Sequence, residues 1–258
     1  MLPILLKTLP FFAVIGLGYV SGRTRFFTPE ATAYLTKFVF YFALSAMVFG
    51  FAANLDLSKD FSWSFIAAYL SATSLVWAIA FVVARMRGAR AEEAVFESHT
   101  AVTGNLGFLG IPMLALLMGP AAAGPVLLVL AMDLALSSSL LTLLITGLRQ
   151  GKMHLSVLRT LGLGLLKNPM IVSIVLGLAW GATGWSLPKP MNEFLVILGA
   201  AATPCALFAI GASLAGNKAE RLGVALWLSF AKLVLHPLAV AIASMWLFDV
   251  DPFAAAVM

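Results

Sequence analysis

Residues 97–112 read Glu97-Ser98-His99-Thr100-Ala101-Val102-Thr103-Gly104-Asn105-Leu106-Gly107-Phe108-Leu109-Gly110-Ile111-Pro112. This stretch lies inside an apolar region long enough to cross a bilayer, yet its glycines and its proline disfavour a continuous helix. Backbone groups without partners are costly in hydrocarbon, so a broken helix persists there only where it lines a cavity or is buried in protein. The stretch therefore predicts one of two structures: the broken, ligand-binding helix of a transporter, or a kinked helix packed through small residues.

The composition around this stretch is that of a polytopic helical membrane protein. Of 258 residues, 62% are hydrophobic and 10% are charged, and the mean hydropathy is +1.01, whereas soluble domains carry about 25% charged residues. The net charge of +5 does not indicate nucleic-acid binding, because the basic residues lie in short loops between apolar segments. The single cysteine, Cys205, cannot form an intrachain disulfide, and no cysteine-based metal site or other cofactor site is expected.

Eight apolar segments have about the 20 residues that a membrane span requires. They are residues 2–21, 31–53, 62–84, 93–118, 121–147, 168–184, 191–215 and 221–247. The fourth is the broken one, and the first reads as a span rather than as a removable signal. The longest connection, 148–167, mixes basic residues with leucines and predicts a short amphipathic helix on the membrane surface.

The lysines and arginines predict the orientation in the membrane. Eleven of the sixteen would lie on one side: Arg23, Arg25, Arg85, Arg87, Arg90, Arg149, Lys152, Arg159, Lys167, Lys218 and Arg221. Three would lie on the other side, Lys7, Lys59 and Lys189, and two lie within spans, Lys37 and Lys232. Because the side rich in basic residues is normally the cytoplasmic one, the N-terminus is expected outside.

The chain also contains a candidate internal repeat. A shift of 159 residues superimposes Pro10 on Pro169, Gly18 on Gly177, Gly22 on Gly181 and Pro29 on Pro188. Five spans separate the copies, so the second copy would enter the membrane from the opposite face, which is typical of inverted-repeat transporters. The alternative is two unrelated apolar hairpins of similar spacing. By this shift, residues 100–147 should recur near 259–306, so a second broken helix and a last span are expected to be missing, in a fragment or in a degenerate relative.

Four motifs carry a resemblance to a known family: the broken stretch 105–112, Lys167-Asn168-Pro169, Thr203-Pro204-Cys205-Ala206-Leu207-Phe208-Ala209-Ile210-Gly211, and Lys232-Leu233-Val234-Leu235-His236-Pro237. Over essentially the whole chain, the sequence resembles the auxin efflux carrier family in its compact bacterial form. The resemblance implies an all-α fold of inverted five-helix repeats, similar to that of bile-acid symporters, with eight of ten expected spans present. It places the first repeat at 1–147 (scaffold 1–53, transport part 61–147), a cytoplasmic connector at 148–167, and an incomplete second repeat at 168–258.

The same resemblance implies a function and a site. It implies a secondary carrier in a bacterial inner membrane that exports small organic anions, such as auxin-like carboxylates, malate or malonate, by alternating access. The implied partners are the anion, the lipid bilayer, H⁺ or Na⁺ as a coupling ion, and a second copy in a homodimer. The family's substrate-binding asparagine corresponds to Asn105. Gly104, Gly107 and Gly110 would let the backbone open or approach the substrate closely, and Pro112 would fix the break.

Three ionisable residues within spans are candidates for coupling or charge balance: Asp133, Lys232 and His236. A carboxylate at the bilayer centre costs roughly 2.5–3.5 kcal/mol on insertion scales, so it usually faces a cavity or a partner. Asp133 would carry a coupling proton or pair with Lys232, and a structural polar contact is the alternative. Lys232 would attract an anion or balance Asp133. His236 shares a helical face with Lys232 and would either titrate or serve packing.

Two other classes of function are weighed against a carrier. An intramembrane enzyme is not favoured, because His99, His154 and His236 fall on different segments and no paired-carboxylate or metalloprotease motif is present. The sequence has no phosphate-binding loop for ATP. A non-transporting sensor or assembly subunit derived from a carrier stays open, because a transport cycle should require both broken helices and a sensor should not.

Overall fold

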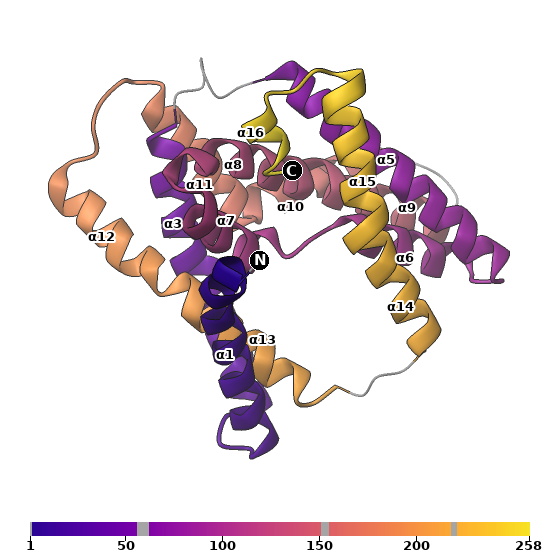
Figure 1. Cartoon of the computed structure of the whole chain (residues 1–258), viewed down its shortest axis with the longest axis horizontal. Helices are drawn as coiled ribbons and strands as arrows, with labels where there is room; N and C mark the ends of the chain where they lie inside the picture. Colours follow the sequence, from indigo (N-terminus) through magenta and orange to yellow (C-terminus); the bar gives the residue numbers. More distant parts are fainter. Residues whose placement is uncertain (1, 56–61, 151–154, 218–220) are drawn as a thin grey trace. The chain divides into compact units, whose positions relative to one another are not determined.

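A computed structural model describes residues 2–55, 62–150, 155–217 and 221–258, and every regular element within these ranges is a helix (Figure 1). Lys59, Lys152, His154 and Lys218, which enter the sequence predictions, lie outside the described residues. Of Pro112, the structure describes the backbone only.

The first half of the chain forms twelve helical elements within the described ranges. They are α1 (Leu2–Arg23), α2 (Pro29–Phe38), η1 (Val39–Ala43), α3 (Leu44–Ala53), α5 (Trp63–Met86), α6 (Ala91–Val102), η2 (Leu106–Gly110), α7 (Ile111–Met118), η3 (Pro120–Ala122), α8 (Ala123–Met132), η4 (Asp133–Ser137) and α9 (Ser138–Gln150). η3 is a short 3₁₀ turn, and the other η elements are π-helical turns continuous with their neighbours.

The second half continues in the same way. Its elements are α10 (Leu155–Lys167), α11 (Pro169–Gly181), α12 (Lys189–Ala200), α13 (Ala202–Leu214), α14 (Leu222–Phe230), the π-helical η5 (Ala231–Leu235), α15 (His236–Ile242), the π-helical η6 (Ala243–Leu247) and α16 (Pro252–Ala255). π-helical turns interrupt regular hydrogen bonding and frequently occur at functional sites.

Six helical segments in the described ranges are long and apolar enough to cross a membrane. They are Ile4–Arg23, Pro29–Ala53, Trp63–Met86, Ala123–Arg149, Lys189–Leu214 and Leu222–Leu247, and each coincides with a predicted span. A seventh candidate combines Leu161–Lys167 with α11 across a 74° bend. The multi-pass architecture is thus confirmed, whereas the count of eight spans stays a prediction, because the segment 93–118 is interrupted.

Helices begin where the sequence supplies a capping side chain. The Thr28 hydroxyl accepts the Ala31 N–H (3.2 Å) before α2, and the Asn168 side chain accepts the Met170 N–H (3.0 Å) before α11. Each cap precedes a proline, whose missing N–H costs nothing in the first turn of a helix. The bend between α10 and α11 therefore falls at Asn168, as a polar cap followed by proline requires.

Replacing Thr28 with alanine is expected to lower the stability of the protein by about 1 kcal/mol, because the Ala31 N–H loses its cap. Thermal unfolding of the purified protein in detergent measures the effect. The control is Thr8→Ala, since the Thr8 hydroxyl only donates to the Leu5 carbonyl within α1. Equal melting temperatures for the two variants would contradict a capping role.

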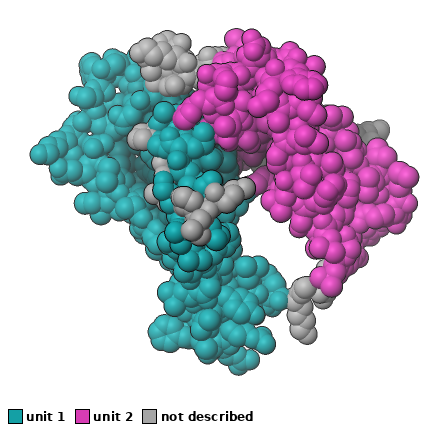
Figure 2. Space-filling model, in the orientation of Figure 1, with its two compact units in different colours: residues 1–58, 105–127, 168–219 teal, residues 59–104, 128–167, 220–258 magenta. Residues whose placement is uncertain are grey.

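The chain divides into two compact units, which Figure 2 colours separately. Unit 1 comprises residues 1–58, 105–127 and 168–219, and unit 2 comprises residues 59–104, 128–167 and 220–258. Each unit therefore draws on both halves of the chain. The chain passes from unit 2 to unit 1 between Gly104 and Asn105, inside the stretch that opens the sequence analysis.

In unit 1, α1 packs along α13 through two glycines four residues apart. A Cβ at Gly18 would overlap the Phe208 carbonyl, and one at Gly22 would lie 2.7 Å from the Ala212 carbonyl oxygen. Small residues at this spacing let membrane helices approach until their backbones touch. Any side chain at Gly18 would therefore force the two helices apart.

The helix pair α11 and α3 makes the equivalent contacts in unit 1. A Cβ at Gly177 would lie 2.8 Å from the Phe49 carbonyl oxygen, and one at Gly181 would lie 3.1 Å from that of Ala53. The 159-residue shift that superimposes the glycines also superimposes Phe49 on Phe208 and Ala53 on Ala212. The register thus relates the partners of the glycines as well as the glycines themselves.

In unit 2, α5 packs against α6 and against α15 and η6. Three buried alanines, Ala80, Ala101 and Ala231, form one cluster, with Trp227 and Leu235 packed around it. Because the alanine side chain is small, the backbones of α5, α6 and η5 can lie close together at this point. Polar side chains on these three elements can therefore reach one another.

Candidate functional site

The helix predicted to be broken is interrupted at Thr103–Asn105. α6 ends at Val102, Thr103 is extended (φ −81°, ψ 120°), and Asn105 is non-helical (φ −88°, ψ 60°) before η2 begins. The predicted break in 93–118 is confirmed. The expectation that Pro112 fixes the break is wrong, because Pro112 lies in the first turn of α7, seven residues beyond Asn105. The preceding π-helical turn leaves room for a proline in a helix that continues through it.

Asn105 caps the helix that follows the break. Its side-chain Oδ1 accepts the Phe108 N–H (3.3 Å), and its backbone oxygen accepts the N–H groups of Leu109 and Gly110 (3.1 Å each). Asn105 is exposed, and no hydrogen bond among the described residues uses its Nδ2. The side-chain oxygen thus satisfies local backbone, while the residue as a whole is exposed.

The glycines of the broken stretch have different surroundings. A Cβ at Gly107 would lie 3.3 Å from the Met170 methyl carbon, so this glycine faces α11. A Cβ at Gly110 would lie 2.7 Å from the side chain of Leu106, one turn earlier. A Cβ at Gly104 would have no heavy atom within 4 Å. Gly104 therefore has space for a ligand beside the backbone, whereas Gly107 and Gly110 serve packing.

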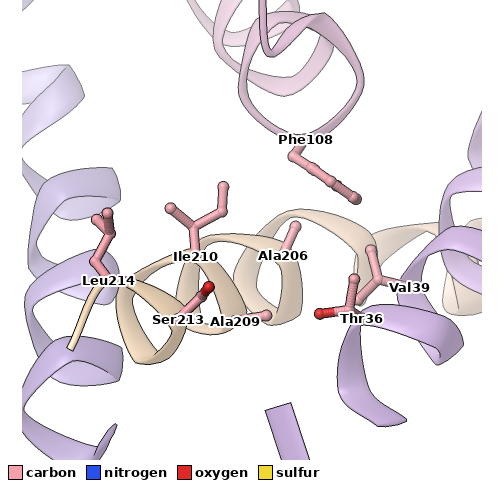
Figure 3. Close-up of a pocket in the computed structure, with 8 residues that line it drawn as sticks. All are labelled: Thr36, Val39, Phe108, Ala206, Ala209, Ile210, Ser213 and Leu214. Carbon is pink, nitrogen blue, oxygen red and sulfur yellow. The ribbon is translucent and has the colours of Figure 1, made fainter. Parts of the chain in front are cut away.

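A cavity of about 230 Å³ in unit 1 lies beside the turn η2. Figure 3 shows Phe108 pointing from η2 toward α13 and Val39, with the hydroxyl groups of Thr36 and Ser213 at the edge. The walls are otherwise apolar, and Val39 and Ala206 are almost fully buried. This cavity is where the turn after the break meets the helices of unit 1.

A second cavity in unit 1, of about 390 Å³, lies between α3 and the α12–α13 pair. Four of its lining residues are the 159-residue equivalents of residues that line the first cavity: Met47 of Ala206, Gly50 of Ala209, Phe51 of Ile210 and Asn54 of Ser213. The 159-residue shift therefore relates part of the lining of the two cavities.

A buried polar cluster occupies unit 2. The Tyr69 hydroxyl donates to Asp133 Oδ1 (2.7 Å), and the Thr73 hydroxyl lies 3.0 Å from His236 Nε2. The rings of Tyr69 and His236 meet edge to face, with centroids 5.9 Å apart. All four of these side chains are buried. We call these four residues the polar cluster.

Lys232 lies next to the polar cluster and binds the end of α6. Its ammonium donates to the backbone carbonyl of Thr103, the first residue of the break. The Thr103 hydroxyl lies 3.4 Å from His99 Nε2. Asp133 and Lys232 are close enough for their charges to interact. The lysine predicted to balance charge within the membrane is therefore held at a helix end.

The candidate residues from the sequence thus fall into two groups. Asp133, Lys232 and His236 gather in unit 2, whereas Asn105, Gly107 and Gly110 belong to unit 1. Sequence reasoning missed Tyr69 and Thr73, although two hydroxyl residues four positions apart within a span are a signal for interhelical hydrogen bonding. Among the described residues, no three His, Cys, Asp or Glu side chains form a group that would hold a metal ion.

Comparison with known proteins gives two matches. The model of the family described as "Membrane transport protein" matches residues 3–258. A protein of Rhizobium meliloti (strain 1021), named "Putative malonate transporter", is 30% identical over 235 residues, which cover 89% of this chain and 72% of that protein.

Proposed function

The chain belongs to the membrane transport protein family that includes the auxin efflux carriers, and from this premise we propose that it is a secondary carrier for small organic anions. It is a multi-pass membrane transporter. The observation that carries the finer assignment is the interrupted helix, whose break presents the Asn105 amide beside a helix N-terminus. The name of the 30% identical relative supports a dicarboxylate such as malonate as the substrate class.

The break has the chemistry to bind a carboxylate. From Leu106 to Met118, η2 and α7 form one continuous helix, so its positive end faces the break. Backbone N–H groups at a helix N-terminus favour anions, and the Asn105 Nδ2 adds a donor. Gly104 leaves open space beside the same backbone. We assign Asn105 and Gly104 to the substrate and Gly107 and Gly110 to the packing of the turn.

Alternating access between two inverted repeats is the mechanism that we propose. Its support is the 159-residue register, which relates the glycine contacts of α1 and α11 and the two cavities of unit 1. The helices of residues 1–53 and their equivalents α11–α13 would form the scaffold, and α5, α6, α9 and α14–α15 would form the transport part. The turn η2 groups with unit 1, so the division would run through the break itself.

The driving force would be an ion gradient or the membrane potential. With the N-terminus outside a bacterial inner membrane, export of an anion from a cell that is negative inside is favoured by about 2.3 kcal/mol per charge per 100 mV. Asp133 is the group that we assign to proton coupling, because its carboxyl is buried and hydrogen-bonded to Tyr69. A homodimer is a further expectation from the family.

Uptake of labelled malonate, malate and indole-3-acetate into proteoliposomes tests this proposal. The wild-type chain is expected to show saturable uptake of at least one anion, and Asn105→Ala is expected to lower it about tenfold or more, since a hydrogen bond to a charged group contributes ~1.5–3 kcal/mol. Asn217→Ala, at an exposed asparagine beyond α13, is the control and should leave uptake unchanged.

A folded protein that binds an anion without moving it would favour the second candidate, a sensor or assembly subunit derived from a carrier. Isothermal titration with malonate establishes binding, which both cases predict, and the uptake assay then separates them, because only the carrier predicts uptake. If the wild type takes up an anion and Asn105→Ala takes it up equally well, the substrate does not bind at the break.

A further inference from the structure

The end of α6 presents backbone carbonyl groups that the interrupted helix cannot pair. Val102 is the last helical residue, and Thr103 is extended. The last carbonyls of a helix have no N–H donors within the helix and carry the negative end of its dipole. In hydrocarbon, such groups need partners from elsewhere in the protein. The break therefore creates a site for a cation as well as a site for an anion.

The cation at this place is the ammonium of Lys232. It donates to the Thr103 carbonyl from η5, 129 positions along the chain. The contact rests on close backbone packing, because Ala101 of α6 and Ala231 of η5 are both fully buried in one cluster. Lys232 itself is half-buried. The ammonium is thus held at the end of α6 by the packing of unit 2 rather than by a chance surface contact.

The groups around the ammonium would suit a free cation equally well. Besides the Thr103 carbonyl, the same residue supplies a hydroxyl, which lies 3.4 Å from His99 Nε2 of α6. Oxygen atoms such as these are the ligands that hard cations bind. Lysine differs from Na⁺ in one respect, which is that its charge is covalently attached to the protein.

Carriers with broken helices coordinate Na⁺ or H⁺ at unwound carbonyls and at the C-terminal ends of half-helices. We propose that the Lys232 ammonium occupies this place as a tethered cation, so that the chain moves its anion without a bound Na⁺. This inference rests on the function proposed above. Because the ammonium stays with the protein, each cycle moves only the charge of the substrate and of any proton, and uptake follows the membrane potential rather than a sodium gradient.

The test compares uptake of labelled malonate with sodium present and with sodium replaced by choline. Wild-type uptake is expected to be the same in both. Lys232→Ala in choline is expected to fall about tenfold or more, for the loss of a charged hydrogen bond, and Na⁺ or methylammonium is expected to restore part of it. Lys37→Met is the matched control, since Lys37 is also a lysine within a span but is exposed beside the Tyr34 ring.

Thermal unfolding in detergent gives a readout that does not require transport. Na⁺ and methylammonium are expected to leave the melting temperature of the wild type unchanged and to raise that of Lys232→Ala, because they fill the vacated site. If the purified wild type moves no anion, the proposed function fails while the melting temperatures still decide whether Lys232 replaces a cation.

Two conservative variants keep the proposal falsifiable where alanine prevents folding. Lys232→Arg retains the charge and should keep uptake independent of sodium. Lys232→Gln retains a hydrogen-bond donor without the charge, so its uptake in choline should fall below that of the wild type. Sodium-dependent uptake by the wild type would overturn the proposal. So would a Lys232→Gln variant with wild-type uptake in choline, or a Lys232→Ala variant whose melting temperature neither cation raises.

Discussion

Replacing Gly18 with leucine is expected to prevent stable folding of unit 1, whereas the same change at Gly16 is expected to be tolerated. A Cβ at Gly18 would overlap the Phe208 backbone carbonyl of α13, which cannot rotate out of the way. A Cβ at Gly16 would have no heavy atom within 4 Å. Overpacking costs about 1–3 kcal/mol in adaptable cores, and here the backbone contact along α1 is lost as well.

The measurement is the amount and the melting temperature of monodisperse protein after extraction in detergent. Gly18→Leu should give little folded protein, and Gly16→Leu should match the wild type. Gly177→Leu should behave like Gly18→Leu, because the carbonyl of Phe49 stands against Gly177 as that of Phe208 stands against Gly18. A Gly18→Leu protein with the wild-type melting temperature would contradict the packing of α1 on α13.

The second large effect is expected at Asp133. Asp133→Ala should abolish anion uptake, because it leaves the buried Tyr69 hydroxyl without its acceptor, and any residual uptake should no longer depend on pH, because the carboxyl that we assign to proton coupling is gone. An unsatisfied buried polar group costs about 1–3 kcal/mol. The alanine variant alone does not separate a structural role from a coupling role, since both would be lost.

Asp133→Asn separates the two roles. Asparagine keeps an acceptor for Tyr69 but cannot ionise, so the variant should fold and retain uptake that no longer depends on pH. Tyr69 of α5 is a titratable group that contacts Asp133 directly. Uptake is measured in proteoliposomes across a pH series with the membrane potential clamped.

Tyr69→Phe is the control for this experiment, because it removes the hydrogen bond and leaves the carboxyl in place. It should lower stability and keep the dependence of uptake on pH. A pH dependence that survives in Asp133→Asn would assign the coupling proton elsewhere, and His236, hydrogen-bonded to Thr73, would be the next group to test.

Local sequence was sufficient for the features that depend on neighbouring residues. Apolar segments of about 20 residues predicted the spans, and six of them are helices of that length in the structure. Glycines within an apolar segment predicted a broken helix, and the family resemblance followed from short motifs. The spans depend on the transfer of a short apolar segment into the membrane, and the broken helix depends on local backbone freedom. A short segment of sequence therefore contains the information needed to predict them.

The tertiary structure alone decided where the break falls and which polar groups meet. The break lies at Thr103–Asn105 rather than at Pro112, because a π-helical turn precedes the proline. Tyr69 meets Asp133 across 64 positions, Lys232 meets Thr103 across 129, and Thr73 meets His236 across 163.

The Lys232–Thr103 contact lies beside the buried alanine cluster of α5, α6 and η5, whose close approach no local pattern of hydrophobicity encodes. The sequence by itself thus determined that this protein is a multi-pass helical transporter with an interrupted span. The packing of distant helices determined what the interruption faces, because a buried polar group must find its partner wherever the backbones come close enough.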